Sequence, residues 1–265
     1  MRSARGAFKQ LRVWLPFRAR SGSRSPPGSL LPPFFLADSP AASSPQDPSP
    51  PFDWAGRYAE QNTPWDLGAA HPELQERRDS LALDPTRGEG RALVPGCGRG
   101  HDAVYLARLG FRVVAVDRVA ELAADLGPRL APHGGEYRVA DALAFDGRSE
   151  GSDEDDGFDL ILDHTFFCAI DPTDRPNWAQ LVTRNLAPGG RLVTLAFPAD
   201  KPWSEGGPPW RTCREEFERF LGSGWQVLED EPLKAPLARR TWEERWLVFE
   251  RAVSDSAPTP AASNP

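Results

Sequence analysis

The chain has 265 residues, of which 40% are hydrophobic and 26% charged, and its formal net charge is -7. This length suits one domain with a sizeable core, and no apolar run approaches the roughly 20 residues of a membrane-spanning helix, so a membrane protein is not expected. The acidic balance offers no electrostatic footprint for nucleic acid, and the three cysteines have neither metal-ligand spacing nor the even count of a disulfide scaffold. These numbers favour a small-molecule partner, and we expect a monomer without a bound metal.

The N-terminal segment, residues 1–51, differs in composition from the rest of the chain. Seven basic residues precede Asp38, the first acidic one. An Arg- and Ser-rich, acid-poor segment is typical of an organelle transit peptide. We therefore expect residues 1–51 to be a leader and linker, and mitochondria are the first organelle to which we expect the leader to direct the protein. The alternative is a disordered extension of a cytoplasmic protein. The tail at 253–265 is rich in Ala, Pro and Ser and predicts a second disordered segment.

Residues 52–252 are expected to form one domain, because apolar runs alternate there with helical patterns. Strands are predicted at 91–95, 111–117, 136–141, 158–163 and 190–197. The helices between them are predicted to run through Tyr105 and Leu109, over 119–130 with an end at Gly127-Pro128, and over 175–187. A helix at 215–221 precedes two strands, 225–231 and 244–252, joined by a basic loop. The pattern predicts an α/β fold in which helices cover both faces of a mostly parallel sheet that ends in an antiparallel hairpin.

A glycine-rich turn follows the first predicted strand, in the segment ALVPGCGRGHD. Gly96, Gly98 and Gly100 stand between a strand and a helix, where glycine permits a tight turn and a close approach of the backbone to a ligand. The dinucleotide fingerprint needs a glycine where this chain has His101, which argues against a nicotinamide oxidoreductase. A GxGxG turn suits a nucleoside that carries an amino acid, because the carboxylate can meet the helix N-terminus.

Acidic residues end the next two predicted strands. Asp117 lies 19 positions after Gly98, where a carboxylate can accept hydrogen bonds from ribose hydroxyls. Asp141 ends the third strand, and together with the backbone amide of Ala142 it can read an adenine edge. These acids could simply begin loops, but their shared place beside the glycine turn favours a nucleoside pocket. S-adenosyl-L-methionine, a cation, suits two acids better than a pyrophosphate does.

Three aromatic residues precede the first strand, in FDWAGRYAEQNTPWDLG. Trp54 and Tyr58, at i and i+4, share one helical face, and Trp65 follows. They can pack a helix onto the sheet as ordinary core residues. They can also form a lid that faces a sulfonium, a cation–π contact of about 0.5–2 kcal/mol. Both interpretations can hold together.

Six motifs occur in a fixed order: TPWD, LVPGCGRGHD, FDLILDHTFFCAI, RPNWA, LAPGG and GGPP. Over about Phe52 to Pro209 the chain therefore resembles the thiopurine/thiol/halide methyltransferase family. The resemblance implies a class I methyltransferase, Rossmann-like fold with seven strands, the last of them antiparallel. It also implies S-adenosyl-L-methionine as the methyl donor. The acceptors it implies are thiols or halide-like soft anions, as in the plant and microbial branch.

Carried over by position, the resemblance places five residues at the cofactor: Trp54, Trp65, Gly96, Asp117 and Asp141. Tyr58 stands where plant-like members have a tryptophan, and His164 stands where they have a tyrosine, beside the methyl-transfer centre. We expect His164 to line a mostly apolar acceptor pocket with Phe166, Phe167 and the GGPPW loop, although it could equally be a packed core histidine. No residue is assigned as catalytic. Cys168 has no base set beside it and is interpreted as a small packing residue.

The segment after the fourth strand also bears on the chemistry. DHTFF replaces the polar-Pro-Pro-aromatic turn that amino-group methyltransferases use, and no metal cluster that would activate a catechol is present. A thiolate or hydrosulfide is already a strong nucleophile, so in-line alignment in a dry pocket can supply most of the rate.

The sequence thus predicts an S-adenosylmethionine-dependent methyltransferase acting on a small thiol or a halide- or hydrosulfide-type nucleophile. One alternative is methylation of another small acceptor, such as a thiopurine-like heterocycle, an arsenic or selenium species, or a hydroxyl. The other is a protein that binds the cofactor without turnover.

Overall fold

A computed structural model describes residues 52–81, 90–148 and 157–252. The expected leader and linker at 1–51 and the expected tail at 253–265 lie outside the described residues, and organelle targeting stays a prediction. Within the described ranges, no helix is long and apolar enough to cross a membrane.

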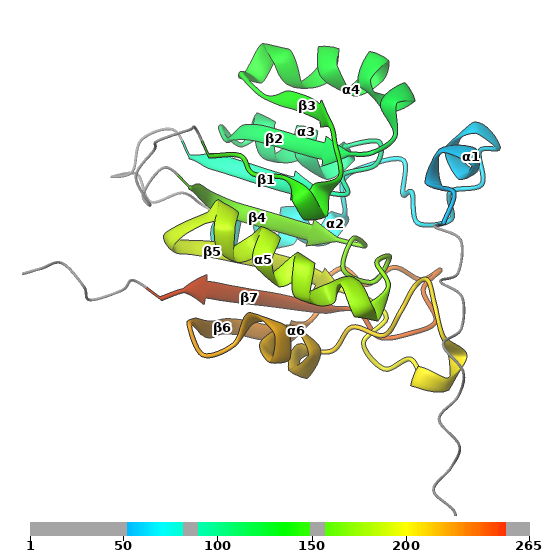
Figure 1. Ribbon diagram of the computed structural model, residues 1–265, viewed down its shortest axis with the longest axis vertical. Coiled ribbons are helices and arrows are strands. Elements are labelled where there is room, and N and C mark those ends of the chain that lie inside the picture. The colour runs from blue at the N-terminus through cyan, green and yellow to red at the C-terminus, as the bar shows by residue number, and fades with distance from the viewer. Residues whose placement is uncertain (1–51, 82–89, 149–156, 253–265) are drawn as a thin grey trace, which may run out of the picture. The chain divides into compact units, whose positions relative to one another are not determined.

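The described residues contain one sheet of seven strands, in the order β3-β2-β1-β4-β5-β7-β6 (Figure 1). The strands are β1 (Arg91–Pro95), β2 (Arg112–Asp117), β3 (Glu136–Val139), β4 (Phe158–His164), β5 (Leu186–Ala196), β6 (Trp225–Pro232) and β7 (Arg245–Arg251). β1 to β5 run parallel, whereas β7 is antiparallel to both β5 and β6. The expected mostly parallel sheet with an antiparallel last strand is confirmed. Its order reverses between β1 and β4, and open α/β sheets bind ligands at the carboxyl ends of the strands at such a point.

The helices lie around the sheet, and all but the first divide between its two faces. They are α1 (Trp54–Ala59), α2 (Pro72–Glu76), α3 (His101–Arg108), α4 (Ala123–Leu130), α5 (Arg175–Asn185) and α6 (Arg214–Leu221). Short 3-10 turns supplement them: η1 (Arg78–Leu81), η2 (Ala120–Leu122), η3 (Ala131–His133), η4 (Ala142–Ala144), η6 (Pro172–Asp174) and η7 (Trp203–Glu205).

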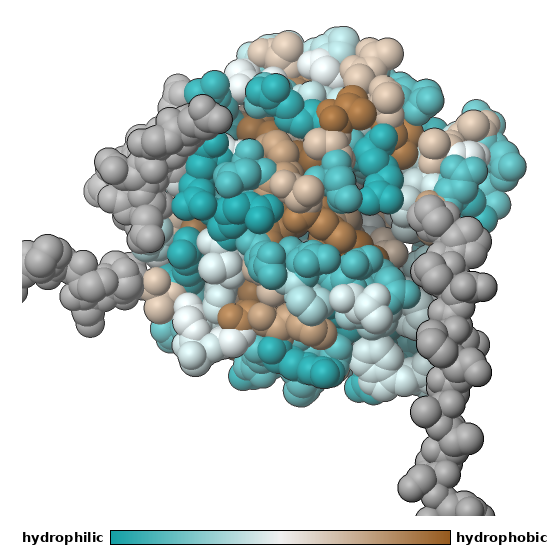
Figure 2. Space-filling view, in the orientation of Figure 1, coloured by the Kyte–Doolittle hydropathy of each residue, from teal (hydrophilic) through white to brown (hydrophobic). Residues whose placement is uncertain are grey.

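Two hydrophobic layers result, because successive strand residues point to opposite faces. α2, α3 and α4 pack in one layer, and α5 and α6 pack in the other. In the view of Figures 1 and 2, α5 and α6 lie in front of the sheet, and brown hydrophobic side chains show between the teal residues of their outer surfaces.

The predicted end of the helix at Gly127-Pro128 is wrong. The segment 120–122 forms the turn η2, and α4 then continues through Pro128 to Leu130. A proline ring clashes with the Cβ of the residue before it, and here that residue is a glycine without a Cβ. Leu126 and Leu130 are both fully buried, so packing on each side of the proline holds the helix together.

The boundary between α5 and β5 also differs from the prediction. α5 ends at Asn185 instead of 187, and β5 begins at Leu186 instead of 190. Leu186 pairs with Phe158 of β4, and the register then shifts before Arg191 pairs with Leu160. The LAPGG segment is therefore an irregular start of a strand, which a sequence pattern for a turn does not reveal.

Asp163 fixes the turn that leaves β4. Its carboxylate is 1% exposed and accepts hydrogen bonds from the Nε1–H of Trp178 (2.8 Å) and from the backbone N–H groups of Phe166 (3.2 Å) and Phe167 (3.1 Å). Burial raises the pKa of Asp163, although these hydrogen bonds oppose the rise. The position of the segment after His164 depends on this buried acceptor.

We expect Trp178→Phe to lower the free energy of unfolding by about 1–3 kcal/mol, because it leaves a buried carboxylate oxygen without its donor. Urea unfolding measures the change. Trp203→Phe is the matched control, since Trp203 is 45% exposed, and it should stay within about 0.5 kcal/mol of the wild type. Equal losses in the two variants would contradict the role of the Asp163–Trp178 bond.

Candidate active site

The glycine turn lies between β1 and α3, at the carboxyl edge of the sheet. Gly96, Gly98 and Gly100 have φ values of +58°, +52° and +67°, in the left-handed region that favours glycine. A Cβ on Gly98 would lie 2.4 Å from the hydroxyl of Tyr58, and one on Gly96 would lie 2.2 Å from the ring of Phe166. The turn therefore contacts both the aromatic segment before β1 and the segment after β4.

Asp117 is held in place against this turn. The N–H of Gly98 donates to its Oδ2 (2.9 Å), and the N–H of Val119 donates to its Oδ1 (3.1 Å). Burial raises the pKa of Asp117, and the backbone donors counteract the rise. The carboxylate is thus fixed at the end of β2, next to β1, with lone pairs left for further donors.

Asp141 and Ala142 lie at the same edge, after β3. The Oδ1 of Asp141 accepts the N–H of Leu143 (3.1 Å) and caps the turn η4, which begins at Ala142. Arg118 forms an ion pair with the same carboxylate at 3.3 Å, and both side chains are about half exposed. Asp141 is therefore more accessible than Asp117 and is shared between a cap and a cation.

The aromatic residues before β1 form a small cluster on α1 and the loop after it. The Nε1–H of Trp65 donates to the hydroxyl of Tyr58 (3.2 Å), and the rings of Trp54 and Trp65 meet edge to face with centroids 5.3 Å apart. Burial raises the pKa of Tyr58 to about 12, so its hydroxyl is protonated at neutral pH. Tyr58 and the other residues of α1 are at most partly buried, and the helix lies beyond the carboxyl ends of the parallel strands (Figure 1). This placement favours a lid over a core helix.

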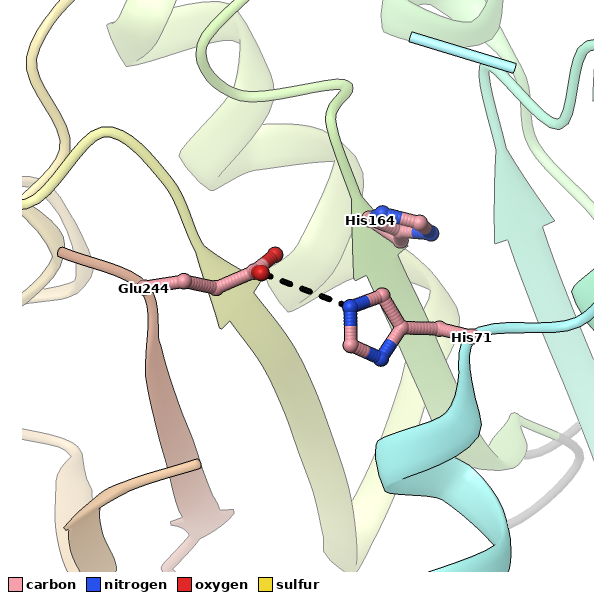
Figure 3. A group of neighbouring side chains, drawn as sticks. All are labelled: His71, His164 and Glu244. Carbon is pink, nitrogen blue, oxygen red and sulfur yellow. Dashed lines mark hydrogen bonds and ion pairs between the residues drawn. The ribbon is translucent and has the colours of Figure 1, made fainter. Parts of the chain in front are cut away.

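His164 is the last residue of β4 and belongs to a polar cluster made with four other residues: His71, Asp102, Arg240 and Glu244. Its Nδ1 lies 2.7 Å from Oδ2 of Asp102, and its Nε2 lies 3.0 Å from a guanidinium nitrogen of Arg240. His71 packs edge to face on His164, with ring centroids 5.1 Å apart, and Glu244 lies beside both (Figure 3). His164 is therefore not an apolar packing residue.

The hydrogen bonds determine the tautomers of both histidines. Arginine has only donors, so Nε2 of His164 accepts and Nδ1 carries the proton that is donated to Asp102. Nδ1 of His71 accepts the backbone N–H of Glu73 (3.1 Å), so its Nε2–H donates to Glu244 (3.3 Å). Both imidazoles are neutral in this arrangement.

The carboxylate of Asp102 joins three elements. Besides His164 at the end of β4, it binds the backbone N–H of His71 (2.8 Å) at the start of α2, while Asp102 itself lies in the first turn of α3. Burial raises the pKa of Asp102, but the hydrogen bonds from the ring of His164 and from the backbone N–H of His71 oppose that effect, and the pKa lies below its ordinary value.

Ligand atoms of His71, His164 and Glu244 lie within 4.8 Å of one another, a spacing that a metal ion could share. The guanidinium of Arg240, however, pairs with Glu244 and donates to His164. The guanidinium of Arg240 thus already donates to Glu244 and His164, where a metal ion would otherwise bind.

The GGPPW loop contacts the segment after β4, as expected. The N–H of Trp210 donates to the carbonyl of Cys168 (2.7 Å), and the Nζ of Lys201 donates to the carbonyl of Pro209 (2.8 Å). The thiol of Cys168 is buried and points to the carbonyl of Thr165, and burial raises its pKa to about 12. A thiol in this state is a poor nucleophile, in agreement with its interpretation as a packing residue.

Sequence reasoning missed four members of the polar cluster: His71, Asp102, Arg240 and Glu244. One signal was available, because Asp102 belongs to the GRGHD motif that carries the family resemblance. Arg240 lies in the loop identified only as basic. No local pattern links His71 to Glu244, because 173 positions separate them in the sequence.

These residues fit S-adenosylmethionine. The glycine turn is packed so closely that a Cβ on Gly98 would collide with Tyr58, Asp117 is an anchored acceptor beside the turn, and the aromatic cluster adjoins it.

Comparison with known proteins agrees with this geometry. The model of the family Thiopurine S-methyltransferase matches residues 50–133 and 135–251. A probable thiol methyltransferase 2 of Arabidopsis thaliana is 37% identical over 171 residues, covering 63% of this chain and 70% of that protein. A thiocyanate methyltransferase 1 of Brassica oleracea is 33% identical over 196 residues, covering 72% and 81%.

Solved structures share the fold. The N-methyltransferase NodS of Bradyrhizobium japonicum, in complex with S-adenosyl-L-homocysteine, superposes with a TM-score of 0.55 at 20% identity, covering 74% of this chain and 96% of that one. An N1-methyltransferase of Burkholderia thailandensis reaches 0.56, also at 20% identity, covering 76% and 86%. The chain belongs to the thiopurine S-methyltransferase family and is an S-adenosyl-L-methionine-dependent methyltransferase with the class I fold.

Proposed function

We propose that this enzyme methylates a small thiol or a comparable soft nucleophile, such as hydrosulfide or a halide, by in-line displacement. The observation that carries the proposal is the place of His164 at the end of β4, with Phe166 reaching back to Gly96 of the glycine turn. Phe167, which was expected beside His164 in the pocket, is instead 1% exposed and stacks on Phe217 in the layer of α5 and α6. An acceptor bound there would meet the ring of Phe166 on one side and the polar cluster around His164 on the other, next to the glycine turn. The relatives named thiol and thiocyanate methyltransferases support this acceptor class.

The cofactor side of the site is proposed to use the residues expected from the sequence. Asp117 would accept the ribose hydroxyls, and Asp141 with the amide of Ala142 would read the adenine. Gly96 and Gly98 would let the backbone approach the amino-acid part of the ligand. When bound, S-adenosylmethionine supplies a methyl carbon on a sulfonium leaving group.

The aromatic lid would exclude water and hold the sulfonium. Trp54, Tyr58 and Trp65 present ring faces and edges next to the turn, and a cation over such a ring gains about 0.5–2 kcal/mol. Because Tyr58 stays protonated, it adds a donor and no competing charge. Alignment in a dry pocket then supplies most of the rate.

A thiopurine-like heterocycle is the second candidate acceptor, because the family description and a 29% identical relative from Pseudomonas aeruginosa name thiopurines. Its sulfur has the same soft character. Turnover of labelled S-adenosylmethionine with thiols, halides and thiopurines distinguishes the two candidates. It also distinguishes an active enzyme from a protein that only binds the cofactor.

We expect Asp117→Ala to weaken the binding of S-adenosyl-L-homocysteine by about 1–3 kcal/mol, because it strands the ribose hydroxyls without an acceptor. Isothermal titration calorimetry measures this loss, and NAD should not bind to either protein. Unchanged affinity for S-adenosyl-L-homocysteine in the variant would refute the ribose assignment.

Gly98→Ala separates the role of the turn from backbone strain. Gly98 and Gly134 both have positive φ, so an alanine at either position should cost about 1–2 kcal/mol of folding free energy. Only at Gly98 does the new Cβ collide, with the hydroxyl of Tyr58, whereas around Gly134 it meets nothing within 4 Å. We expect Gly98→Ala alone to lose affinity for S-adenosyl-L-homocysteine, by about tenfold or more. Equal affinities of the two variants would argue against a cofactor site at this turn.

We expect His164→Tyr to keep cofactor affinity and to change the ratio of thiol to halide turnover, since an imidazole and a phenol differ in charge and proton affinity. Labelled S-adenosylmethionine with thiols, halides and thiopurines measures the acceptor profile of both proteins. An unchanged profile would show that His164 does not set acceptor choice.

A further inference from the structure

We propose that His164 and Asp102 form a dyad that removes the proton of a neutral thiol acceptor, with His164 as the general base and Asp102 as its positioning residue. The proposal rests on the proposed function and names a chemical role for its acceptor site. Of the possible acceptors, only those that carry a proton need such a base.

The geometry of the pair suits proton transfer at Nε2. The 2.7 Å contact between Nδ1 of His164 and Oδ2 of Asp102 fixes the tautomer that leaves Nε2 as an acceptor. A carboxylate on the far nitrogen also stabilises the imidazolium that forms when Nε2 takes a proton. The side chain of His164 is 9% exposed and that of Asp102 is 14% exposed, so the charge would form in a largely dry environment.

The charges around His164 favour this imidazolium. Asp102 on α3, Asp163 on β4 and Glu244 before β7 are acidic, whereas Arg240 is the cation of the cluster that binds the ring. His71 is held neutral by its own hydrogen bonds, and the neighbouring Cys168 thiol stays protonated because burial raises its pKa to about 12. The adjacent Arg239 donates to the carbonyl of Asp66 instead. The surroundings of His164 therefore carry an excess of negative charge that one added proton reduces.

Arg240 can release Nε2 of His164 and still keep its ion pair with the carboxylate of Glu244. It donates to His164 through one guanidinium nitrogen and binds Glu244 through another, and it also stacks 4.2 Å from the ring centroid of Phe197. A protonated Nε2 is a donor and can no longer accept from arginine. The guanidinium would then face the sulfur that has lost its proton, as a counter-charge.

The S–H bond of the acceptor breaks and its proton forms an N–H bond at Nε2 of His164. The sulfur keeps the electron pair and forms a bond to the methyl carbon. The bond between that carbon and the sulfonium sulfur breaks, and its electron pair stays on the departing thioether. Solvent later takes the proton from His164.

The size of the effect follows from acceptor acidity. A thiol with the cysteine reference pKa of about 8.5 is only about 3% thiolate at pH 7, so a base can raise its turnover by at most about 30-fold there. The gain vanishes above the pKa of the thiol. It is also absent for an acceptor that is already an anion.

Asp102→Asn tests the dyad while preserving shape. Its amide oxygen can still accept the N–H of His71, but its NH₂ would face Nδ1 of His164 and impose the tautomer with the proton on Nε2. The probes are 2-mercaptoethanol, which is almost wholly protonated at pH 7, and 4-nitrothiophenol and iodide, which are anions. We expect the kcat/KM ratio of 2-mercaptoethanol to either anion to fall by about tenfold or more at pH 7, because this thiol is less acidic than cysteine, and to recover as the pH rises past the thiol pKa.

His164→Gln should show the same acceptor-dependent pattern. Asp125→Asn on α4 is the matched control, because it removes an acid that is 68% exposed and paired only with Arg129 in the described structure, and its acceptor ratio should equal that of the wild type. Melting temperature and affinity for S-adenosyl-L-homocysteine verify that each variant is folded.

Three results would overturn the dyad. Either variant could lower the turnover of all acceptors by one common factor, which indicates a structural role. Either could leave the acceptor ratio at its wild-type value. A wild-type enzyme that methylates only thiopurines, and none of the three probes, would contradict the proposed acceptor class itself, and the dyad would fall with it.

Discussion

The two hydrogen bonds of the Asp102 carboxylate hold the polar cluster around His164 together. One oxygen binds the N–H of His71 at the start of α2, and the other binds the ring of His164 at the end of β4. Asp102 lies in the first turn of α3, directly after the glycine turn, where the helix N-terminus stabilises an anion. The same short segment therefore shapes the cofactor turn and orients the imidazole beside it.

The topology of the sheet explains why the glycine turn and His164 lie next to each other. β1 and β4 are neighbours although 62 positions separate Asp102 from His164 in the sequence, because β2 and β3 extend the sheet to the other side of β1. The reversal leaves room at the carboxyl edge, and the glycine turn, Asp117 and His164 all lie there. A cofactor and an acceptor bound at this edge would lie next to each other, as the proposed in-line displacement requires.

The sequence predicted the strands, and it predicted that the glycine turn and Asp117 lie together at one edge of the sheet, because these signals are local. Buried β-branched runs mark β1 and β2 to within one residue, and the glycines and Asp117 lie within one loop and one strand of each other. The failures have local causes as well: Gly127 lets α4 pass through Pro128, and LAPGG starts β5 although it has turn composition.

The polar cluster around His164 was not predicted, because its signal is not local. His164 stood out by its place after a strand, yet a packed core histidine was an equal alternative. What distinguishes the two is the set of partners, and these come from α2, α3 and the loop before β7. Nothing in the spacing of Arg240 or Glu244 links them to His164. Their meeting follows from the antiparallel return of β7 beside β5.

The proposed dyad depends on which ring nitrogen of His164 carries the proton, and ¹⁵N NMR of the histidine rings tests this most directly. The chain has four histidines, so the ring signals of His164 can be assigned by comparison with His164→Gln. We predict a neutral ring at pH 7 with the proton on Nδ1, and a change to the tautomer with the proton on Nε2 in Asp102→Asn. A wild-type ring that carries its proton on Nε2 would contradict the dyad and the hydrogen bonds from which it is inferred.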